Sequence, residues 1–298
     1  MSGKTLLITG AHGLVGQYIF KLRAQWSGRI IFTGRGESRL PVGEYIYEEM
    51  DITNQQRIHD VFAKYSPDIV IHTAAMAQAD ECEEQKEKAL LNNVTASTYL
   101  LNAAEAFQAF FIFLSTDFIF SGEDGPYDEN AIPDPVNFYG QTKWMAEKYV
   151  KSYPFGSAIV RTVLIYGNVL SGTRSNIISW ARSALEKAIP FKVVSDQIRA
   201  TTYAADLVWA LFTIADKKSE GVWNIAGKNN LSPYDIVQHV AAYLDLDASK
   251  AEKVDASTFT QVARRPLKTP FIIEKARREL NYDPHSFDEA MRKVLNGD

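Results

Sequence analysis

The chain starts with a strand, a glycine turn and a helix, and this order constrains its fold more strongly than its composition does. Residues 5–9 form a continuous apolar run, three glycines follow it directly, and apolar residues then recur at helical spacing. Glycines placed in this way permit a tight turn, let backbone amides approach a phosphate, and let the helix pack on the strand. The order predicts a pyrophosphate-binding turn with these contacts: Gly10, His12, Gly13, Leu14, Val15 and Gly16.

Strands and helices alternate through the first half of the chain. Apolar runs and helical spacing predict these elements: strands at 29–33, 45–51, 68–72, 111–114 and 158–167, and helices at 54–65 and 81–107. Such alternation is typical of an α/β fold with a Rossmann-type, doubly wound parallel sheet. Ligands of such sheets bind beyond the carboxyl ends of the strands, so the residues after each strand are the candidate site.

The alternation loosens after residue 166. The pattern there predicts helices at 176–187 and 203–214, a strand at 221–225 that returns to the sheet, and further helices from 233 onward. We therefore predict a dinucleotide-binding domain at 1–166, joined by 201–226. A smaller substrate-binding lobe is expected from 167–200 and 227–298.

The end of the second predicted strand bears on the choice between NAD and NADP. In dinucleotide folds a carboxylate there favours the 2′-hydroxyl of NAD, whereas an arginine accommodates the 2′-phosphate of NADP. Strand 29–33 ends without an acidic residue, and Arg35 stands just beyond it. Arg39 and His12 are further candidates for the phosphate. NADP is therefore favoured, while Glu37 keeps NAD open.

The ends of the next two predicted strands supply further cofactor contacts. The third strand ends near the expected position of the adenine, and the small residues after strand 68–72 would let a cofactor lie against the backbone. His72 itself is interpreted as a packed strand residue. The expected contacts are Asp51, Ile52, Thr73, Ala74 and Ala75.

A tyrosine and a lysine four residues apart supply the candidate chemistry. Tyr139 and Lys143 lie at the start of a predicted helix, where this spacing places both side chains on one face. A nearby ammonium favours phenolate and is expected to lower the pKa of the tyrosine, which suits proton transfer to a sugar oxygen. Thr116, at the end of strand 111–114, could hold the same oxygen. These three residues are the predicted catalytic group.

Composition excludes several other classes of function. A formal net charge of −4 gives no basic surface for nucleic acid and no polybasic membrane arm. Apolar runs stay shorter than a membrane span, and residues 1–4 lead into a strand rather than a signal peptide. Cys82 is the single cysteine, which leaves no internal disulfide and no cysteine-based metal site. A cytoplasmic location without nucleic-acid or membrane partners is expected, and no metal is predicted.

Taken together, these motifs resemble an extended short-chain dehydrogenase/reductase, and within that family the dTDP-4-dehydrorhamnose reductase branch. The resemblance covers nearly the whole chain. The segments that carry it are 9–16, 72–75 with 79–83, 93–94, 115–120, 125–129, 135–147, 161–167 and 196–197.

The resemblance implies a proton donor at Tyr139, a lysine that holds the nicotinamide ribose at Lys143, and a substrate hydrogen bond from Thr116. The reaction implied is hydride transfer from NADPH to the C4 ketone of a nucleotide-linked 6-deoxy sugar. Asn93 matches the family's helix asparagine, next to the cofactor, with a structural or water-relay role. A homodimer is kept open. The substrate contacts expected are Asp117, Phe118, Leu164, Asn176 and Arg199.

The sequence departs from the branch at positions that face the sugar. Phe118 replaces a tyrosine, and Leu164 replaces an aromatic residue. Polar sites discriminate substrates strongly through hydroxyl and amide contacts, so these changes can redirect specificity while the chemistry stays the same.

Two alternatives remain open. An NAD-dependent sugar-nucleotide epimerase or dehydratase would share Tyr139 and Lys143, although Arg35 argues against its usual acidic ribose contact. A non-catalytic, NADP-binding regulatory subunit, resembling the beta subunit of methionine adenosyltransferase, would keep the fold without turnover. The intact Thr116, Tyr139 and Lys143 count against that second alternative.

Overall fold

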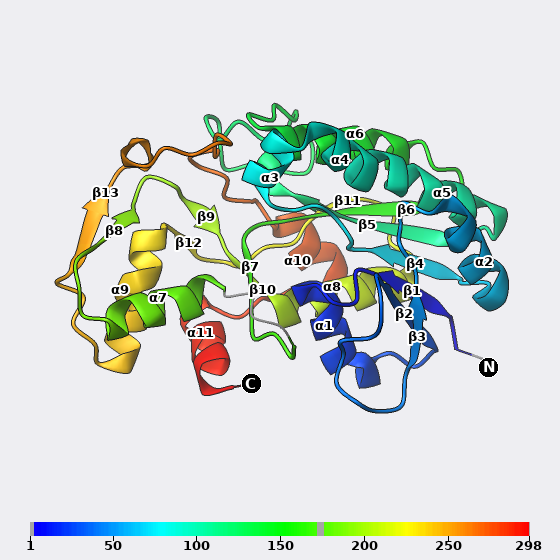
Figure 1. Cartoon of the computed structure of the whole chain (residues 1–298), viewed down its shortest axis with the longest axis horizontal. Helices are drawn as coiled ribbons and strands as arrows, with labels where there is room; N and C mark the ends of the chain where they lie inside the picture. The colour runs from blue at the N-terminus through cyan, green and yellow to red at the C-terminus, as the bar shows by residue number, and fades with distance from the viewer. Residues whose placement is uncertain (1–2, 172–175, 298) are drawn as a thin grey trace.

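The central sheet confirms the predicted α/β architecture. The computed structural model describes residues 3–171 and 176–297, and within these residues seven strands form one parallel sheet in the order β3-β2-β1-β4-β5-β6-β11 (Figure 1). The bounds are β1 Leu6–Thr9, β2 Ile30–Gly34, β3 Ile46–Glu49, β4 Ile69–His72, β5 Phe110–Thr116, β6 Ser157–Thr162 and β11 Gly221–Asn224. The order reverses between β1 and β4, where ligands of such sheets bind.

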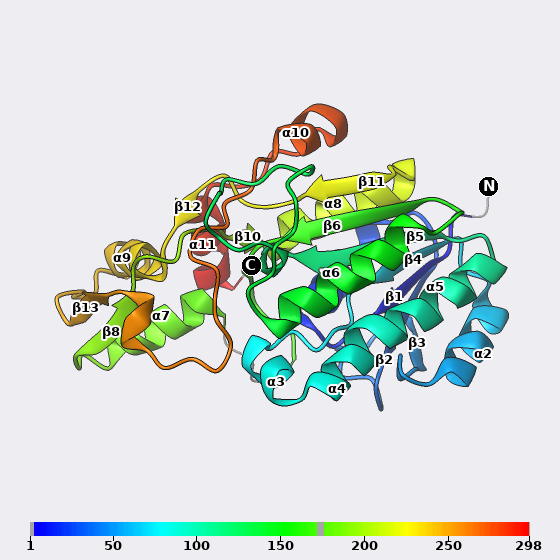
Figure 2. The same ribbon diagram turned by 90° about the horizontal axis from the view of Figure 1, so that it is seen from above.

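Helices cover both faces of the sheet (Figure 2). One face carries α2 (Gln55–Tyr65), α5 (Ala96–Ala106) and α6 (Phe138–Lys151), and the other carries α1 (Leu14–Lys21) and α8 (Ala204–Lys217). The inner strands β1, β2, β4, β5 and β6 are almost entirely buried, which explains why they read as continuous apolar runs. Among the described residues, no helix is both long and apolar enough to cross a membrane.

The later part of the chain forms a smaller group of elements beside the carboxyl end of the sheet (Figure 1). It contains α7 (Ile177–Glu186), α9 (Pro233–Leu244), α11 (Phe287–Asn296), the pair β8 (Phe191–Val194) with β13 (Ala251–Val254), and the pair β9 (Arg199–Ala200) with β12 (Asn230–Leu231). The domain limits stay a prediction. Helix α10 (Glu274–Leu280) belongs to the segment predicted for the smaller lobe, and it packs against β11 and α8 of the predicted dinucleotide-binding domain.

Three predicted elements differ from the structure. The third strand ends at Glu49, because the Asp51 carboxylate accepts hydrogen bonds from the Thr53 backbone N–H at 2.9 Å and its hydroxyl at 2.8 Å, and so turns the chain. The long helix at 81–107 is divided, because Gln85 has non-helical dihedrals (φ −125°, ψ 59°). Its parts are α3 (Ala79–Glu84), α4 (Lys86–Leu90), a π-helical turn (Leu91–Thr95) and α5.

The predicted strand at 158–167 is two strands in two sheets. Leu164 adopts a left-handed backbone (φ 30°), which ends β6 and redirects the chain into β7 (Ile165–Tyr166). β7 pairs with β10 (Thr202–Tyr203) instead of continuing the central sheet. The Thr202 backbone N–H donates to the Val163 carbonyl at 3.0 Å, and the Thr202 hydroxyl accepts from the Val163 N–H at 3.3 Å.

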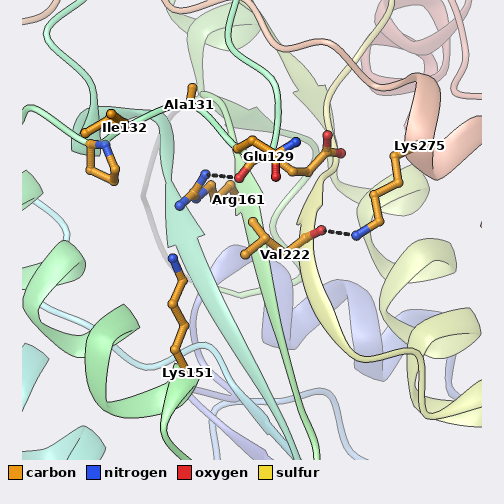
Figure 3. Close-up of a pocket in the computed structure, with 9 residues that line it drawn as sticks. Glu129, Ala131, Ile132, Lys151, Arg161, Val222 and Lys275 are labelled. Carbon is orange, nitrogen blue, oxygen red and sulfur yellow. Dashed lines mark hydrogen bonds between the residues drawn. The ribbon is translucent and has the colours of Figure 1, made fainter.

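A buried ion pair joins α6 to the inner strand β6 of the sheet. Arg161 of β6 donates to Glu147 of α6 through Nε at 3.1 Å and Nη2 at 2.8 Å, and each side chain is 1% exposed. The guanidinium also donates to the Glu129 carbonyl at 3.2 Å and lies at one wall of a cavity of about 410 Å³ (Figure 3). Lys151 and Lys275 line the same cavity, so it lies along α6 and β11, away from the start of α6.

Removal of one partner of this pair should destabilise the protein strongly. Glu147→Ala would leave the Arg161 charge buried without compensation, which typically costs about 3–5 kcal/mol of the free energy of unfolding. Urea unfolding followed by circular dichroism measures this. As a control, Glu186→Ala removes the exposed pair with Arg182 and should cost about 0.5 kcal/mol or less. Similar losses of the free energy of unfolding in the two variants would contradict the buried Arg161–Glu147 ion pair as the cause.

Candidate active site

The glycine turn after β1 closes against the end of β4. Gly10 has φ +77°, and a Cβ atom there would lie 2.8 Å from the Thr73 hydroxyl oxygen and 2.9 Å from the Ala74 nitrogen. A Cβ atom on Gly16 would collide with the Gly10 carbonyl oxygen. The Thr73 hydroxyl donates to the Thr9 carbonyl at 2.6 Å and ties the two strand ends together. The predicted pyrophosphate contacts therefore lie next to one another. The glycines leave the backbone at the start of α1 uncovered by side chains, which suits an anion.

Gln17 is a residue of this region that the sequence analysis missed. It is buried in α1, and its amide nitrogen donates to the His12 carbonyl at 2.9 Å and to the Ser171 carbonyl at 3.1 Å. Its amide oxygen accepts from the Leu170 N–H at 2.6 Å. One side chain thereby joins the glycine turn to the segment after β7. A polar residue inside an apolar helix face was the available signal.

A basic cluster lies beyond the end of β2. The Arg39 backbone N–H donates to His12 Nε2 at 3.1 Å, and the Arg39 guanidinium lies 3.1 Å from Nδ1 of the same ring. Burial and the Arg39 charge lower the pKa of His12, so the imidazole is neutral. The ring also stacks on Tyr47, with 5.4 Å between centroids. Arg35 is exposed next to this cluster, so the predicted 2′-phosphate candidates occupy one region of the surface.

Some predicted cofactor contacts also serve the fold. One oxygen of the Asp51 carboxylate, Oδ1, accepts from Thr53, and the side chains of Val15 and Ile52 are buried in the core. Leu14 is half-buried at the start of α1, and Ala75 is exposed after β4. Their backbones keep the predicted places at the edge of the sheet. Side-chain contact with a cofactor is not supported for Val15 and Ile52.

Asn93 is a positioning residue in this structure. Its amide oxygen accepts from the Met76 N–H at 2.8 Å, and its nitrogen donates to the Met76 carbonyl at 3.0 Å and the Thr142 hydroxyl at 3.0 Å. The side chain is buried, and these bonds use both of its N–H donors and one of the two acceptor positions of its oxygen. Asn93 therefore fixes the loop after β4 to α6, while its contact with a cofactor stays a prediction.

The start of α6 is held firmly, and this places Tyr139. The Asn137 side chain caps the helix by accepting from the Gly140 N–H at 2.8 Å, and Glu83 accepts from the Phe138 N–H at 2.7 Å. Tyr139 therefore projects from the first turn of α6 toward the end of β5. There the side chain of Thr116 acts to lower the pKa of Tyr139. Their joint role at one substrate oxygen stays a prediction.

Lys143 lies one turn further along the same face. Its side chain is 3% exposed, and its ammonium lies 3.8 Å from the centre of the Phe113 ring. Among the described residues, the ammonium makes no hydrogen bond. Burial lowers the pKa of Lys143 to about 7, partly offset by Glu147. A buried cation with its donors unused is suited to bind an oxygen-rich ligand.

The expected lowering of the pKa of Tyr139 by Lys143 is wrong for this structure. Burial raises the pKa of Tyr139 above its usual value of 10.0, and the side chain of Thr116 only partly opposes that effect. Burial also lowers the charged fraction of Lys143 near neutral pH, so this residue stabilises phenolate less than a fully ionised lysine would. Tyr139 therefore remains a phenol at neutral pH, which is the form that donates a proton.

Asp117 and Arg199 form a buried cluster with a third residue, Thr269. The Thr269 hydroxyl donates to Asp117 Oδ2 at 2.5 Å, and Arg199 Nη1 donates to the Thr269 hydroxyl at 2.9 Å. Arg199 Nη1 lies 3.6 Å from the same carboxylate oxygen, and Nη2 donates to the Pro266 carbonyl at 3.0 Å. Burial raises the pKa of Asp117, which Arg199 and the donated hydrogen bonds oppose. The predicted substrate contacts Asp117 and Arg199 thus bind each other.

The remaining predicted substrate contacts divide into two kinds. Phe118 is half-buried, with its ring 5.9 Å from the Tyr139 ring, and Leu164 is 39% exposed beyond β6, one strand from Thr116. Both offer apolar surface at the carboxyl edge. Asn176 instead caps α7, accepting from the Ile178 N–H at 2.9 Å and donating to the Gly167 carbonyl at 2.7 Å. Its side chain is therefore structural.

Comparison with known proteins places this architecture in a family. A family model described as the RmlD substrate binding domain matches residues 4–297. Methionine adenosyltransferase 2 subunit beta from Xenopus tropicalis is 27% identical over 313 residues, which cover 93% of this chain and 91% of that protein.

Two solved structures share the fold over their whole length. A dTDP-4-dehydrorhamnose reductase from Clostridium acetobutylicum has a TM-score of 0.85 and 26% identity, covering 98% of each chain. A dTDP-4-dehydrorhamnose reductase from Bacillus anthracis, solved in complex with NADP, has a TM-score of 0.84 and 24% identity, covering 100% of each chain. The chain therefore belongs to the RmlD substrate binding domain family, which is of the extended short-chain dehydrogenase/reductase type.

Proposed function

We propose that this chain is an NADP-dependent oxidoreductase that reduces the C4 ketone of a nucleotide-linked 6-deoxy sugar, in the manner of a dTDP-4-dehydrorhamnose reductase. The observation that supports this most is the placement of Tyr139 one helical turn before the buried Lys143 in α6, which packs on β5, the strand that ends at Thr116. The pyrophosphate-type turn at Gly10 belongs to the same edge of the sheet. A cytoplasmic location and a homodimer remain predictions from the sequence.

The chemistry divides between cofactor and protein. A nicotinamide cofactor supplies the hydride that adds to the carbonyl carbon. Tyr139 donates its hydroxyl proton to the carbonyl oxygen, which completes the alcohol and leaves a phenolate. Lys143 would hold the ribose hydroxyls of the cofactor and stabilise the phenolate through its positive charge. The proton that Tyr139 loses is regained from solvent through groups at the edge of the site.

The walls of the site support a sugar with an apolar substituent. Phe118, whose ring lies 5.9 Å from the Tyr139 ring, and Leu164, which is exposed after β6, offer carbon surface at this edge that would suit the methyl group of a 6-deoxy sugar. Burial of such a group against apolar side chains is favourable by about 1 kcal/mol. A sugar with a hydroxyl at this carbon would lose a hydrogen bond to water there.

A regulatory function is the second candidate, and the similarity to methionine adenosyltransferase 2 subunit beta favours it. A subunit of that kind would bind NADP and a catalytic partner without turnover. Mixing the chain with a methionine adenosyltransferase catalytic subunit, followed by size-exclusion chromatography, tests this. A stable complex together with no reductase activity would replace our proposal. Tightly held NAD in the purified protein would instead favour an epimerase or dehydratase.

The first test of the proposed reaction is oxidation of NADPH, followed at about 340 nm, with dTDP-4-dehydro-6-deoxy-L-mannose as the substrate. Tyr139→Phe should lower the turnover by about a hundredfold to ten-thousandfold, because the proton donor is lost while the ring is kept. Tyr149→Phe, an exposed tyrosine on the same helix, is the matched control and should retain full activity. Turnover that persists in Tyr139→Phe would refute the assigned proton donor.

The reaction should slow as the pH rises through about 7. Lys143 is charged below its lowered pKa of about 7 and neutral above it, so kcat/KM for ketone reduction should fall about tenfold per pH unit on the alkaline side. Lys143→Arg keeps the charge and should move that limb upward. The unfolded chain binds the extra proton between about pH 7 and 10.5, so this residue's contribution to stability rises with pH across that window. If kcat/KM of the wild type does not change with pH on the alkaline side, the role of the Lys143 ammonium in the reaction is contradicted.

The basic cluster should set the preference for NADP over NAD. Arg39→Ala removes a guanidinium from His12 and should weaken NADPH binding by about tenfold or more, since a charge-assisted hydrogen bond is worth about 1.5–3 kcal/mol. Arg35→Ala should act in the same direction. NADH binding should change less than about twofold in both. Fluorescence titration of the bound cofactors measures this, with the exposed Arg278→Ala as control. Equal losses of affinity for NADPH and NADH would show that these arginines do not bind the 2′-phosphate.

A further inference from the structure

Arg265 lies before α10, in the segment predicted for the smaller lobe, and binds a carboxylate of the first half of the chain. Its Nη1 and Nη2 both donate to Asp80 of α3, the second at 2.7 Å, and the Ala263 N–H donates to the same carboxylate at 2.8 Å. The hydrogen bonds from Arg265 lower the pKa of Asp80 to about 2, so this residue is a carboxylate. A bidentate geometry is the one in which a partly exposed ion pair keeps its position. Residues 263–265 are thereby fixed to the first turn of α3.

Helix α3 in turn supports the start of α6. Glu83 of α3 accepts from the N–H of Phe138, the first residue of α6, at 2.7 Å. Cys82 of the same helix is buried in a small apolar cluster, against which Phe138 and Tyr139 pack. The Cys82 thiol also donates to the Met76 carbonyl at 3.3 Å. A displacement of α3 would therefore move the surface on which Tyr139 rests.

A second contact joins the neighbouring residue of that segment to the same turn of α6. The amide nitrogen of Asn137 donates to the Arg264 carbonyl at 2.8 Å, and its amide oxygen accepts from the Gly140 N–H at 2.8 Å. Asn137 is buried, so water does not compete for these bonds. The first N–H groups of a helix have no partners within the helix, and external acceptors therefore hold its first turn. Tyr139 lies between Phe138 and Gly140, the two residues whose N–H groups are held in this way.

The first turn of α6 lies in direct contact with the loop after β5. A Cβ atom on Gly140 would lie only 2.0 Å from the Phe118 carbonyl oxygen, and the Phe118 and Tyr139 rings are 5.9 Å apart. The position of this turn therefore determines where the Tyr139 phenol lies relative to the end of β5. A proton donor must stay within hydrogen-bond reach of its acceptor, and a misplacement of about 1 Å can lower a rate about a hundredfold. Contacts that hold this turn thus bear on turnover.

We propose that Arg265 is a positioning residue for Tyr139, which it reaches through Asp80 and α3. The Arg264 carbonyl adds the parallel contact through the cap at Asn137. This inference rests on the proposed function for its effect on turnover, whereas the connection from Arg265 to the start of α6 can be tested without a substrate. The candidate proton donor belongs to the predicted dinucleotide-binding domain and is held in place from the segment predicted for the substrate-binding lobe.

Amide hydrogen exchange, followed by NMR on the whole ¹⁵N-labelled chain, tests the connection without turnover. Arg265→Met keeps the apolar stem and removes the guanidinium. It should raise the exchange rate of the Phe138 N–H about tenfold, because the carboxylate that caps it moves with α3, while residues 146–150 of α6 keep their rates. Arg182→Met removes an exposed pair with Glu186 and is the matched control, expected to change neither. An unchanged rate at Phe138, or an equal increase along the whole of α6, would overturn the proposal.

A kinetic comparison tests the consequence for turnover, with the folded fraction of each variant measured by NADPH binding. Arg265→Met should lower kcat about tenfold while KM stays within about twofold, and Arg265→Lys, which keeps a charged donor, should lose less. Asp80→Asn should resemble Arg265→Met, and the double variant should lose no more than either single variant, because both remove one connection. Losses that multiply in the double variant, or a change in KM as large as that in kcat, would overturn the positioning role. If the wild type reduces no keto sugar, the proposed function fails, and the exchange rates still decide this inference.

Discussion

The parallel direction of the central sheet is the constraint on which the site depends. All seven strands of the described sheet point the same way, so the residues that follow β1, β4, β5 and β6 meet at one edge. Gly10, Thr73 and Thr116 come from three of these strands, although more than 100 residues separate the first from the last. Parallel strands also need helices on both faces, and this brings α6 to the same edge with Tyr139 at its first turn.

The sequence predicted what local spacing determines. A glycine turn between strand and helix, and a tyrosine four residues before a lysine, fix their own local geometry, so the spacing predicted the turn at Gly10 and the shared helix face of Tyr139 and Lys143. Thr269 could not be placed in this way, because its partner Asp117 lies 152 residues away and nothing near it in the chain signals the contact. The break at Leu164 was equally hidden, since an apolar run carries no sign of a left-handed residue.

Two arginines from the later part of the chain form ion pairs with carboxylates from its first half. Arg199 faces Asp117, and Arg265 binds Asp80 of α3, with 2.7 Å between its Nη2 and Oδ2. The Asn137 amide donates to the Arg264 carbonyl at 2.8 Å and adds a third link to the same segment. Arg199 and Asp117 are buried, so their pair offsets a desolvation cost, whereas Asp80 keeps 44% of its side chain exposed and its pair with Arg265 stays in contact with water.

The inward face of α6 carries Tyr139, Lys143 and Glu147 at successive intervals of four residues. A rotation of this helix by one residue, about 100°, would move the Tyr139 phenol away from Thr116. The same rotation would expose the Glu147 carboxylate and leave the Arg161 guanidinium without its partner. The end of α6 with Tyr139 and the end with Glu147 therefore cannot change their orientation independently of each other. Mutations elsewhere that loosen the helix are first opposed by the folding energy of the ion pair. In this way, natural selection for a stable protein would also preserve the alignment of its candidate proton donor.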